Sequence, residues 1–343
     1  SGLMCIFVIM IFLTGGTGLV GSHILLKLCE NNIPVRALKR QSSSLNICKK
    51  VFNYYNRQDL FNTIEWRTGN INDVPFLESS MSSCDYIIHA AALVSFNKSD
   101  LEDLKRINIE GTSNIMNVAL GLDIKKCIYI SSIATLGISP NMQEINEECD
   151  FKFTNKESNY SISKYYAEQE VWRACHEGLD VVILNPSVIL GPGDWNKGSS
   201  KIFQRIFNGL KFYTPGSTGF VDVIDIANIT ILFLHNNIKN QRFILNGTNL
   251  KYRDAFNFIA DEFSVERASV KVTPLIKELA WRLESIRSFF LQTSPLLTKE
   301  TAESAMSKKS YSSSKIKKVL DYNFISFNDS IQKYCKFYNS DLL

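Results

Sequence analysis

The sequence predicts an α/β protein built on a doubly wound parallel sheet, with a smaller, interleaved, mostly helical region towards the C-terminus. The first half alternates short apolar runs with longer amphipathic ones, a pattern typical of strand-helix-strand units. A glycine-rich turn directly follows the first apolar run, and the alternation stops near residue 190. At 343 residues, the chain is long enough for one large domain with a smaller appendage.

Six apolar runs are predicted to be buried strands, and three amphipathic stretches are predicted to be helices. The predicted strands are 9–13, 35–38, 64–67, 86–89, 127–130 and 181–184. The predicted helices are 23–31, 103–120 and 161–177, and each is followed by a turn or helix-breaking residue. Beyond residue 190 we expect a helix at 199–210, a strand end and helix at 220–234, and a mostly helical remainder.

The apolar segment 4–13 is interpreted as leading into the first buried strand. It is too short to span a bilayer, it lacks a basic start, and it runs straight into the glycine-rich turn. We therefore expect no transmembrane segment.

The net charge and the spacing of the cysteines argue against nucleic acid and metal ions as partners. The net charge of +4, with only short runs of Lys and Arg, does not favour nucleic acid. The eight cysteines lie far apart, with no pair at metal-ligand or redox spacing. We therefore predict no metal site and a reduced, cytoplasmic setting.

The turn at 14–21 reads Thr-Gly-Gly-Thr-Gly-Leu-Val-Gly between the first strand and a predicted helix. This is the context that a dinucleotide-binding fingerprint requires. Glycines permit the tight turn and let backbone N–H groups approach a pyrophosphate at the positive end of the helix dipole. The residues expected to bind the cofactor here are Gly15, Thr17, Gly18, Leu19 and Val20.

The end of the second predicted strand favours NADP over NAD. An NAD site usually offers Asp or Glu there to the ribose hydroxyls, but no carboxylate stands between Val35 and Asp59. Lys39 and Arg40 occupy that point instead, and Arg can bind a 2′-phosphate through two hydrogen bonds. We predict NADP as the cofactor; the alternatives are that NAD is used and that both cations face solvent.

A tyrosine four residues before a lysine occurs twice, as Tyr160/Lys164 and Tyr311/Lys315. On a helix this spacing places both side chains on one face, where the ammonium favours the phenolate and supports proton transfer. Only the first pair begins a helix that follows a strand ending in Ser131-Ser132, so these groups can meet at one edge of the sheet. We interpret Tyr311 as a surface tyrosine beside a helix N-cap serine.

With the glycine turn, the serine pair and Tyr160/Lys164 in this order, the chain resembles the extended short-chain dehydrogenase/reductase family, within the NAD-dependent epimerase/dehydratase superfamily. The resemblance covers nearly the whole chain. Further matches are His89-Ala90-Ala91-Ala92, Asn108-Ile109-Glu110-Gly111-Thr112, the pattern Tyr-x-x-x-Lys-x-x-x-Glu from Tyr160 to Glu168, and the segments 185–193 and 221–227. The resemblance implies a Rossmann domain at 4–190, to which 220–245 returns, and a substrate-binding region at 191–219 and 246–343.

The resemblance also implies roles for individual residues. Tyr160 would be the general acid/base, Ser132 would hydrogen-bond the reacting oxygen, and Lys164 would bind the nicotinamide ribose and lower the pKa of Tyr160. The register against the family favours Ser132 over Ser131 in that role. Tyr160 is implied in cofactor binding as well as in catalysis. The other residues implied in cofactor binding are Asn70, which stands where the family often has Asp, and Ile71, Ala90, Ala91, Ala92, Asn108, Ser131, Pro186, Ser187 and Val188. His89 is expected to be a packed structural histidine, with catalysis as its alternative.

Within the family, the chain looks most like the dihydroflavonol reductase and 3β-hydroxysteroid dehydrogenase branch. This implies reduction of a ketone or aldehyde, or oxidation of the corresponding alcohol. One alternative is a nucleotide-sugar epimerase or dehydratase with tightly bound NAD, whose substrate diphosphate would be bound by Lys197, Lys201, Arg205 and Arg242. Another is an inactive NAD(P)-binding regulator, against which the intact Ser132, Tyr160 and Lys164 set argues.

The C-terminal region is rich in Phe and Leu, which favours a hydrophobic small-molecule substrate. Within it, the stretch 275–290 is amphipathic. We interpret this stretch as part of the core. A lid, the face of a homodimer and a membrane-surface contact are its alternatives.

Overall fold

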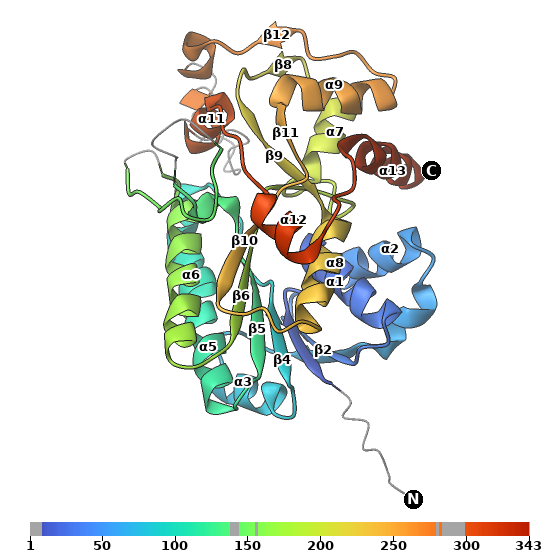
Figure 1. Cartoon of the computed structure of the whole chain (residues 1–343). Coiled ribbons are helices and arrows are strands. Elements are labelled where there is room, and N and C mark those ends of the chain that lie inside the picture. The colour runs from blue at the N-terminus through green and yellow to red at the C-terminus, as the bar shows by residue number, and fades with distance from the viewer. Residues whose placement is uncertain (1–8, 138–143, 155–156, 279–280, 283–298, 343) are drawn as a thin grey trace, which may run out of the picture.

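A seven-stranded parallel β-sheet forms the middle layer of the structure (Figure 1). The computed structural model describes residues 9–137, 144–154, 157–278, 281–282 and 299–342. The strands are β1 (Ile11–Thr14), β2 (Val35–Lys39), β3 (Glu65–Thr68), β4 (Tyr86–His89), β5 (Lys126–Ile130), β6 (Val181–Pro186) and β10 (Gln241–Leu245). They run in the order β10-β6-β5-β4-β1-β2-β3, and every neighbouring pair is parallel. The predicted parallel sheet is confirmed, with all six expected strands in it and β10 added at one edge.

The strand order reverses at β1, which has β2 and β3 on one side and β4, β5 and β6 on the other. In open α/β sheets, ligands bind outside the carboxyl ends of the strands at such a switch point. Thr14 at the end of β1 lies opposite His89 at the end of β4. The fold therefore brings the residues that follow these two strands to one place.

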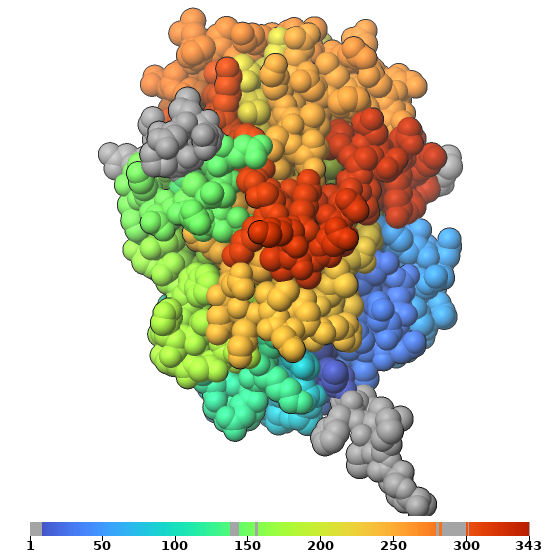
Figure 2. All heavy atoms as spheres, viewed as in Figure 1, coloured from blue at the N-terminus to red at the C-terminus, as the bar shows by residue number. Residues whose placement is uncertain are grey.

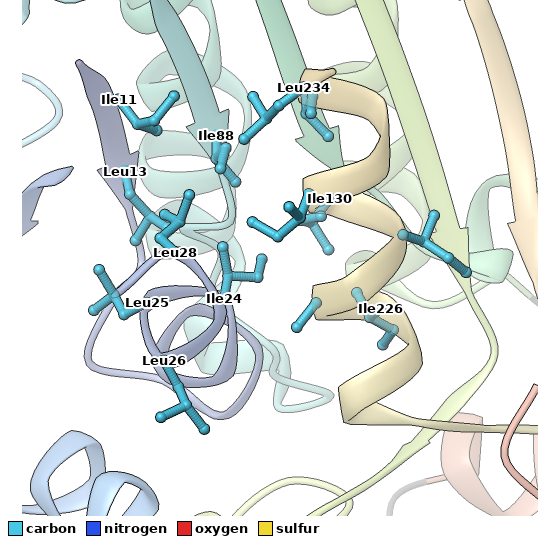
Figure 3. Close-up of a cluster of buried hydrophobic side chains, with 14 of the residues drawn as sticks. Ile11, Leu13, Ile24, Leu25, Leu26, Leu28, Ile88, Ile130, Ile226 and Leu234 are labelled. Carbon is cyan, nitrogen blue, oxygen red and sulfur yellow. The ribbon is translucent and has the colours of Figure 1, made fainter. Parts of the chain in front are cut away.

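Helices cover both faces of the sheet. On one face lie α1 (Leu19–Glu30) and α8 (Val223–Leu234), with α2 (Asn46–Tyr54) beside α1. On the other lie α3 (Val74–Met81), α5 (Gly111–Gly121) and α6 (Asn159–His176). Figure 3 shows the first of these cores, to which Ile24 of α1, Ile130 of β5 and Ile226 of α8 all contribute. Each such buried aliphatic side chain stabilises the packing by about 1.5–3 kcal/mol, so the core holds α1 and α8 in place.

The predicted helix 103–120 consists of three pieces. They are α4 (Leu101–Leu104), a π-helical segment (Lys105–Glu110) and α5. The buried Asn108 lies in the π-helical segment, where its Nδ2 donates to the Leu93 carbonyl (3.0 Å) and to Ser163 Oγ (2.9 Å). Its Oδ1 accepts from the Leu93 N–H at 2.7 Å. The π-helical turn thus places the Asn108 amide where it hydrogen-bonds both the loop after β4 and helix α6.

The chain beyond β6 contributes a second, smaller region, which lies above the sheet in Figure 1. Its helices are α7 (Lys201–Phe207), α9 (Tyr252–Glu262), α11 (Lys299–Met306), α12 (Ser314–Leu320) and α13 (Phe327–Ser340). The strand end predicted at 220 belongs to β9 (Ser217–Asp222), which leads into α8 as expected. The other strands of this region, which the sequence did not predict, are β7 (Val188–Leu190), β8 (Phe212–Tyr213), β11 (Thr248–Lys251) and β12 (Val270–Lys271). The amphipathic stretch 275–290 lies largely outside the described residues. Within the described part of the chain, no helix combines the length and apolar character needed to cross a membrane.

The C-terminal segment is tied to the start of α8 by two buried carboxylates. In Figure 2 the red C-terminal residues lie across the middle of the molecule, between the orange upper region and the yellow residues below. Asp222, the N-cap of α8, accepts hydrogen bonds from Ser330 Oγ and from Tyr334 Oη. Asp225 accepts from Tyr322 Oη (2.8 Å) and from the Ile325 N–H (3.1 Å). The two regions are therefore joined by polar contacts as well as by apolar packing.

Asp225 is expected to make stability depend on pH. Burial raises the pKa of Asp225 from 3.8 to about 7. The stability that the protonated carboxyl contributes to the fold is therefore fully present below pH 3.8 and is lost as the pH rises through about 7. Each pKa unit corresponds to about 1.4 kcal/mol, so this loss amounts to a few kcal/mol. Asp225→Asn should flatten the dependence, as measured by thermal unfolding across this range. The exposed Asp254→Asn on α9 is the control, and equal slopes in both variants would contradict the prediction.

Candidate active site

The glycine turn between β1 and α1 leaves no room for side chains. Gly15 has a φ of +78°, and a Cβ there would lie 2.6 Å from the carbonyl carbon of Ala90. A Cβ on Gly21 would lie 2.1 Å from the carbonyl oxygen of Gly15. The Gly18 N–H donates to that same oxygen at 3.0 Å. The turn is therefore packed directly against the residues that follow β4.

Two observations at the carboxyl edge of the sheet, one at this turn and one after β6, fit a bound dinucleotide. Gly18 is the N-cap of α1 and offers no side chain to the first N–H groups of the helix, which leaves them for an anion. Ser187 lies between β6 and β7 and is buried, and its Oγ has no hydrogen-bond partner among the described residues. The predicted residues Thr17, Leu19 and Val20 lie in or directly after the turn.

The predicted 2′-phosphate residues lie at the carboxyl end of β2, next to β1. Lys39 is the last residue of the strand, and its carbonyl accepts from the Gly69 N–H at 3.0 Å. Arg40 is exposed, with its Nε 3.5 Å from Ser43 Oγ. Both cations are therefore at the same sheet edge as the glycine turn.

Asn70 and Ile71, which the resemblance implies in cofactor binding, lie in a turn that follows β3. Asn70 is exposed, and its Oδ1 accepts from the Asn72 N–H at 3.1 Å. Ile71 is buried, and its carbonyl accepts from Asn114 Nδ2 at 3.3 Å. The turn lies beside the carboxyl end of β2, where Lys39 and Arg40 also lie.

Tyr160 and Ser132 meet at the carboxyl edge of the sheet. Tyr160 lies in the first turn of α6, and Ser132 follows β5, where its Oγ accepts from the Ala134 N–H at 3.1 Å. The Ser132 hydroxyl lies close enough to the phenol to lower the pKa of Tyr160, which partly opposes the burial that raises it. The ring of Phe96 lies edge-on to that of Tyr160, with centroids 5.6 Å apart. The phenol is therefore protonated at neutral pH.

The Lys164 side chain does not reach Tyr160 in the way that its spacing implied. Its Nζ donates to Tyr129 Oη at 2.7 Å and to the Ile130 carbonyl at 3.0 Å. Burial lowers the pKa of Lys164 to about 7, although the carboxylate of Glu168 raises it. The pKa of Tyr160 is raised by its own burial, whereas the resemblance implied that Lys164 lowers it.

Glu168, the last residue of the Tyr-x-x-x-Lys-x-x-x-Glu pattern, anchors the strand ends behind the site. It is 1% exposed, and its Oε2 accepts from Ser131 Oγ (2.5 Å) and Thr135 Oγ1 (2.9 Å). Its Oε2 also accepts from Asn185 Nδ2 at 3.0 Å, and its Oε1 lies 3.4 Å from Arg242 Nη1. Ser131 therefore serves this network, and Ser132 is the serine that contacts Tyr160.

The remaining predicted residues separate into those beside the turn and those inside the fold. Ala90, Ala91 and Ala92 follow β4 beside the glycine turn, and Pro186 and Val188 flank Ser187. Asn108 is a buried brace whose amide is occupied by Leu93 and Ser163. His89 is buried, with Nδ1 2.6 Å from Thr14 Oγ1 and Nε2 2.9 Å from Thr112 Oγ1. The prediction of a packed histidine is confirmed.

The description of Tyr311 as a surface tyrosine is wrong. Tyr311 is 4% exposed because it pairs with Ile145 in an isolated parallel bridge and packs against Leu136. Its partner in the spacing, Lys315, donates to the Arg242 carbonyl at 2.9 Å and lies over the ring of Phe243. Lys315 of the second Tyr/Lys pair therefore packs against β10, an edge strand of the sheet.

Sequence reasoning missed Tyr129 and Phe96. Tyr129 lies between Ile128 and Ile130 in a strand where every residue is buried, and a hydroxyl in such a run was its signal. Phe96 lies in the irregular loop after β4, and nothing in its sequence surroundings indicated a contact with Tyr160. Among the described residues, no group of three or more His, Cys, Asp or Glu side chains is arranged to hold a metal ion.

Comparisons with known families, sequences and solved structures show which proteins the chain resembles. A family model described as the NAD dependent epimerase/dehydratase family matches residues 11–245. A Synechocystis sp. protein named as a dihydroflavonol 4-reductase is 36% identical over 220 residues, which is 63% of this chain and 60% of that protein. The chain thus matches less than two thirds of the length of that relative. Cinnamoyl-CoA reductase 1 of Oryza sativa subsp. japonica is 22% identical over 301 residues, 84% of this chain and 87% of that protein.

Two solved structures show how widely the fold is shared. The crystal structure of gox2253 aligns with a TM-score of 0.79 and 26% identity, covering 97% of this chain and 98% of the other. UDP-glucose 4-epimerase from Thermotoga maritima aligns with a TM-score of 0.76 and 18% identity, covering 98% and 100% of the two chains. At that lower identity the likeness concerns the fold alone.

Proposed function

The chain belongs to the NAD dependent epimerase/dehydratase family, and on that premise we propose that it reduces a ketone or an aldehyde to the alcohol with NADPH. It is an NAD(P)-dependent oxidoreductase of this family. The observation that carries the proposal is the contact of Tyr160 with Ser132 at the carboxyl edge of the sheet. Because burial raises the pKa of Tyr160, the phenol keeps its proton at neutral pH and can donate it.

In the proposed reaction, Ser132 and Tyr160 donate hydrogen bonds to the carbonyl oxygen of the substrate. The bound nicotinamide supplies the hydride that the carbonyl carbon accepts. As negative charge develops on the oxygen, Tyr160 transfers its phenolic proton there, and the Lys164 ammonium stabilises the phenolate that remains. Oxidation of the alcohol would use the same groups in reverse.

The preference for NADPH is proposed from Lys39 and Arg40 at the end of β2. A charge-assisted hydrogen bond contributes about 1.5–3 kcal/mol, so Lys39→Ala combined with Arg40→Ala should weaken NADPH binding by more than about tenfold. NADH binding should change little, because NADH has no 2′-phosphate. Fluorescence titration with both nucleotides measures this, with the exposed Lys49→Ala on nearby α2 as the control. Equal losses for NADPH and NADH would contradict the preference.

A nucleotide-sugar epimerase or dehydratase is the alternative, and Arg242 argues against it. Its Nη1 lies 3.4 Å from Glu168, and its Nε donates to the Glu147 carbonyl at 2.7 Å. Arg242 is thus used inside the fold, and Lys197 lies 3.6 Å from the carboxylate of Asp194. Lys201 and Arg205, four residues apart on α7, are the remaining cations predicted for a diphosphate. An inactive regulator is disfavoured because Ser132, Tyr160 and Lys164 are all present.

Cofactor retention separates the reductase from the epimerase. A reductase must release NADP⁺ in every turnover, whereas an epimerase regenerates its own NAD. The protein purified without added nucleotide is therefore expected to contain little bound NAD and to bind NADPH reversibly. One tightly bound NAD per chain, released only on denaturation, would contradict the reductase proposal.

We propose an apolar carbonyl compound as the substrate, bound by residues 191–219 and 246–343 beside the sheet edge. The proposal is supported by relatives named as reductases of a dihydroflavonol and of cinnamoyl-CoA. Phe96 and Ile133 add apolar side chains next to Tyr160 and Ser132.

Two further proposals concern the setting of the protein. A reduced, cytoplasmic location is supported by the described cysteines, which are free thiols and mostly buried. A homodimer is the assembly we expect to find, and the molar mass of the protein in solution tests it.

A further inference from the structure

A second tyrosine, Tyr129, holds the ammonium of Lys164. Lys164 Nζ donates to Tyr129 Oη at 2.7 Å and lies 4.4 Å from the centroid of the same ring. Both side chains are 1% exposed, so the contact is shielded from water. With the Ile130 carbonyl at 3.0 Å, strand β5 takes two of the three N–H donors of the ammonium.

The direction of the hydrogen bonds makes the Tyr129 hydroxyl an acceptor for Lys164. An ammonium has no lone pair, so it can only donate. Thr112 lies close enough to Tyr129 to lower the pKa of that phenol, and Thr112 Oγ1 lies 2.6 Å from the Asn108 carbonyl, to which it must donate. Thr112 can therefore offer only a lone pair to Tyr129, and the polar contacts run from Lys164 through Tyr129 and Thr112 to a backbone carbonyl.

His89 holds the same threonine from the other side. Because the Thr112 hydroxyl proton is used by Asn108, His89 Nε2 must donate to Thr112 Oγ1 across their 2.9 Å contact. His89 Nδ1 then accepts from Thr14 Oγ1 at 2.6 Å. The polar chain thus connects the end of β1, next to the glycine turn, with the lysine of α6.

Few of the groups around Lys164 stabilise its positive charge. Burial lowers the pKa of Lys164 to about 7, and Glu168 on the same helix opposes this. From β4, His89 is neutral, because burial and the Lys164 charge lower the pKa of His89 to about 3. Burial raises the pKa of Tyr129 on β5, which therefore faces the ammonium as a neutral phenol, and burial likewise keeps Tyr160 on α6 neutral. The hydroxyl of Tyr129 is thus one of few groups that favour the charged form.

We propose that Tyr129 is a positioning residue that holds the Lys164 ammonium at the carboxyl edge of the sheet and keeps it charged at neutral pH. The inference rests on the proposed function, because it concerns the phenolate stabilisation assigned there to Lys164, together with the nicotinamide ribose contact that the family resemblance implies for this lysine. Tyr129 acts through Lys164 and is itself too buried to meet substrate. Replacing its hydroxyl by hydrogen leaves Lys164 with the Ile130 carbonyl in a buried, less polar place.

The pH dependence of NADPH binding tests this role without requiring turnover. Dissociation constants are measured by fluorescence titration from about pH 6 to about pH 10 for the wild type, Tyr129→Phe and Lys164→Met. In the wild type, affinity should fall as Lys164 loses its proton. In Tyr129→Phe the midpoint should lie about one pH unit lower, because a hydrogen bond to a charged group is worth about one pKa unit or more. Lys164→Met should show weak binding without this midpoint.

Tyr334→Phe is the matched control, because Tyr334 is a buried tyrosine whose hydroxyl donates to Asp222, away from Lys164. It should leave the midpoint where it is in the wild type. A Tyr129→Phe profile that superposes on the wild type would overturn the positioning role while leaving NADPH binding in place. Wild-type protein that binds no NADPH at any pH would instead contradict the proposed function.

A second variant covers the case in which Tyr129→Phe does not fold. Thr112→Val removes the acceptor that orients the Tyr129 hydroxyl but leaves that hydroxyl in place. Its midpoint should move in the same direction by less than one unit. An unchanged midpoint in Thr112→Val would count against the proposal in the same way.

Discussion

Tyr160→Phe is expected to lower kcat by about 10²- to 10⁴-fold while leaving NADPH affinity unchanged. The variant keeps the ring, and with it the edge-on contact to Phe96, whose centroid lies 5.6 Å away. It removes only the hydroxyl whose pKa Ser132 lowers and which carries the transferred proton. Steady-state kinetics with a carbonyl substrate and a fluorescence titration with NADPH measure the two quantities separately.

The second Tyr/Lys pair of the chain supplies the control. Tyr311 is also buried and also precedes a lysine by four residues, but Lys315 donates to the Arg242 carbonyl, away from the Tyr160 hydroxyl. Tyr311→Phe is therefore expected to retain the wild-type kcat. Turnover by Tyr160→Phe at the wild-type rate would show that another group donates the proton.

Glu168→Ala is expected to destabilise the fold by about 3–5 kcal/mol. The change leaves Arg242, whose side chain is 18% exposed, without its carboxylate partner. It also takes the acceptor from Ser131, Thr135 and Asn185, which lie at the ends of β5 and β6. Urea unfolding followed by circular dichroism gives the free energy of unfolding directly.

Two further variants distinguish the effect of the Glu168 charge from the effect of its side-chain shape and from a general effect of mutating helix α6. Glu168→Gln keeps an acceptor for the hydroxyls but loses the charge opposite Arg242, so it should cost less than Glu168→Ala. Glu170→Ala, on the same helix, removes a partly exposed pair with Arg173 and should cost less than about 1 kcal/mol. A Glu168→Ala protein as stable as Glu170→Ala would refute the anchoring role.

Most of the central sheet could be predicted because its inner strands are largely apolar. Val181–Pro186 and Tyr86–His89 are both buried between layers of helices, so side chains on either face are apolar. The strands β7, β8, β11 and β12 were missed because two to four residues are too few to show a period. They are held by pairing with distant segments, such as β11 with β9.

The helices α2 and α3 were missed for a related reason. They are nine and eight residues long, and little of either is apolar enough to stand out from the surrounding loops. The Asp73 side chain caps α3 by accepting from the Phe76 N–H at 3.1 Å. An Asp at this position is a local sequence signal for the start of a helix.

The site was predictable where spacing and strand ends determine position. Ser132 and Tyr160 are 28 residues apart in the chain, and the sheet brings their hydroxyls together as expected. The contact of Lys164 was not predictable, because helix spacing describes neighbours along α6 and says nothing of the strand beneath it. The buried face of α6 lies on β5, and Tyr129 is nearer to the ammonium there than Tyr160 is along the helix.

Tyr311 shows the opposite error, in which local sequence hid a long-range contact. The polar run before it, from Ser307 to Ser310, indicated a surface position. The chain nevertheless bridges to Ile145, more than 160 residues earlier, and that pairing buries the ring. Burial of this kind depends on tertiary structure and leaves no pattern in the neighbouring residues.

Coupling of NADPH oxidation to carbonyl reduction tests the central claim most directly. The purified protein is incubated with NADPH and a panel of apolar aldehydes, ketones and aryl thioesters, and NADPH loss is compared with alcohol or aldehyde formed. We predict stoichiometric hydride transfer to at least one class of carbonyl compound, absent in Tyr160→Phe and retained in Tyr311→Phe. Failure to oxidise NADPH with any of them, together with epimerisation of a nucleotide sugar by protein that retains NAD, would contradict the account.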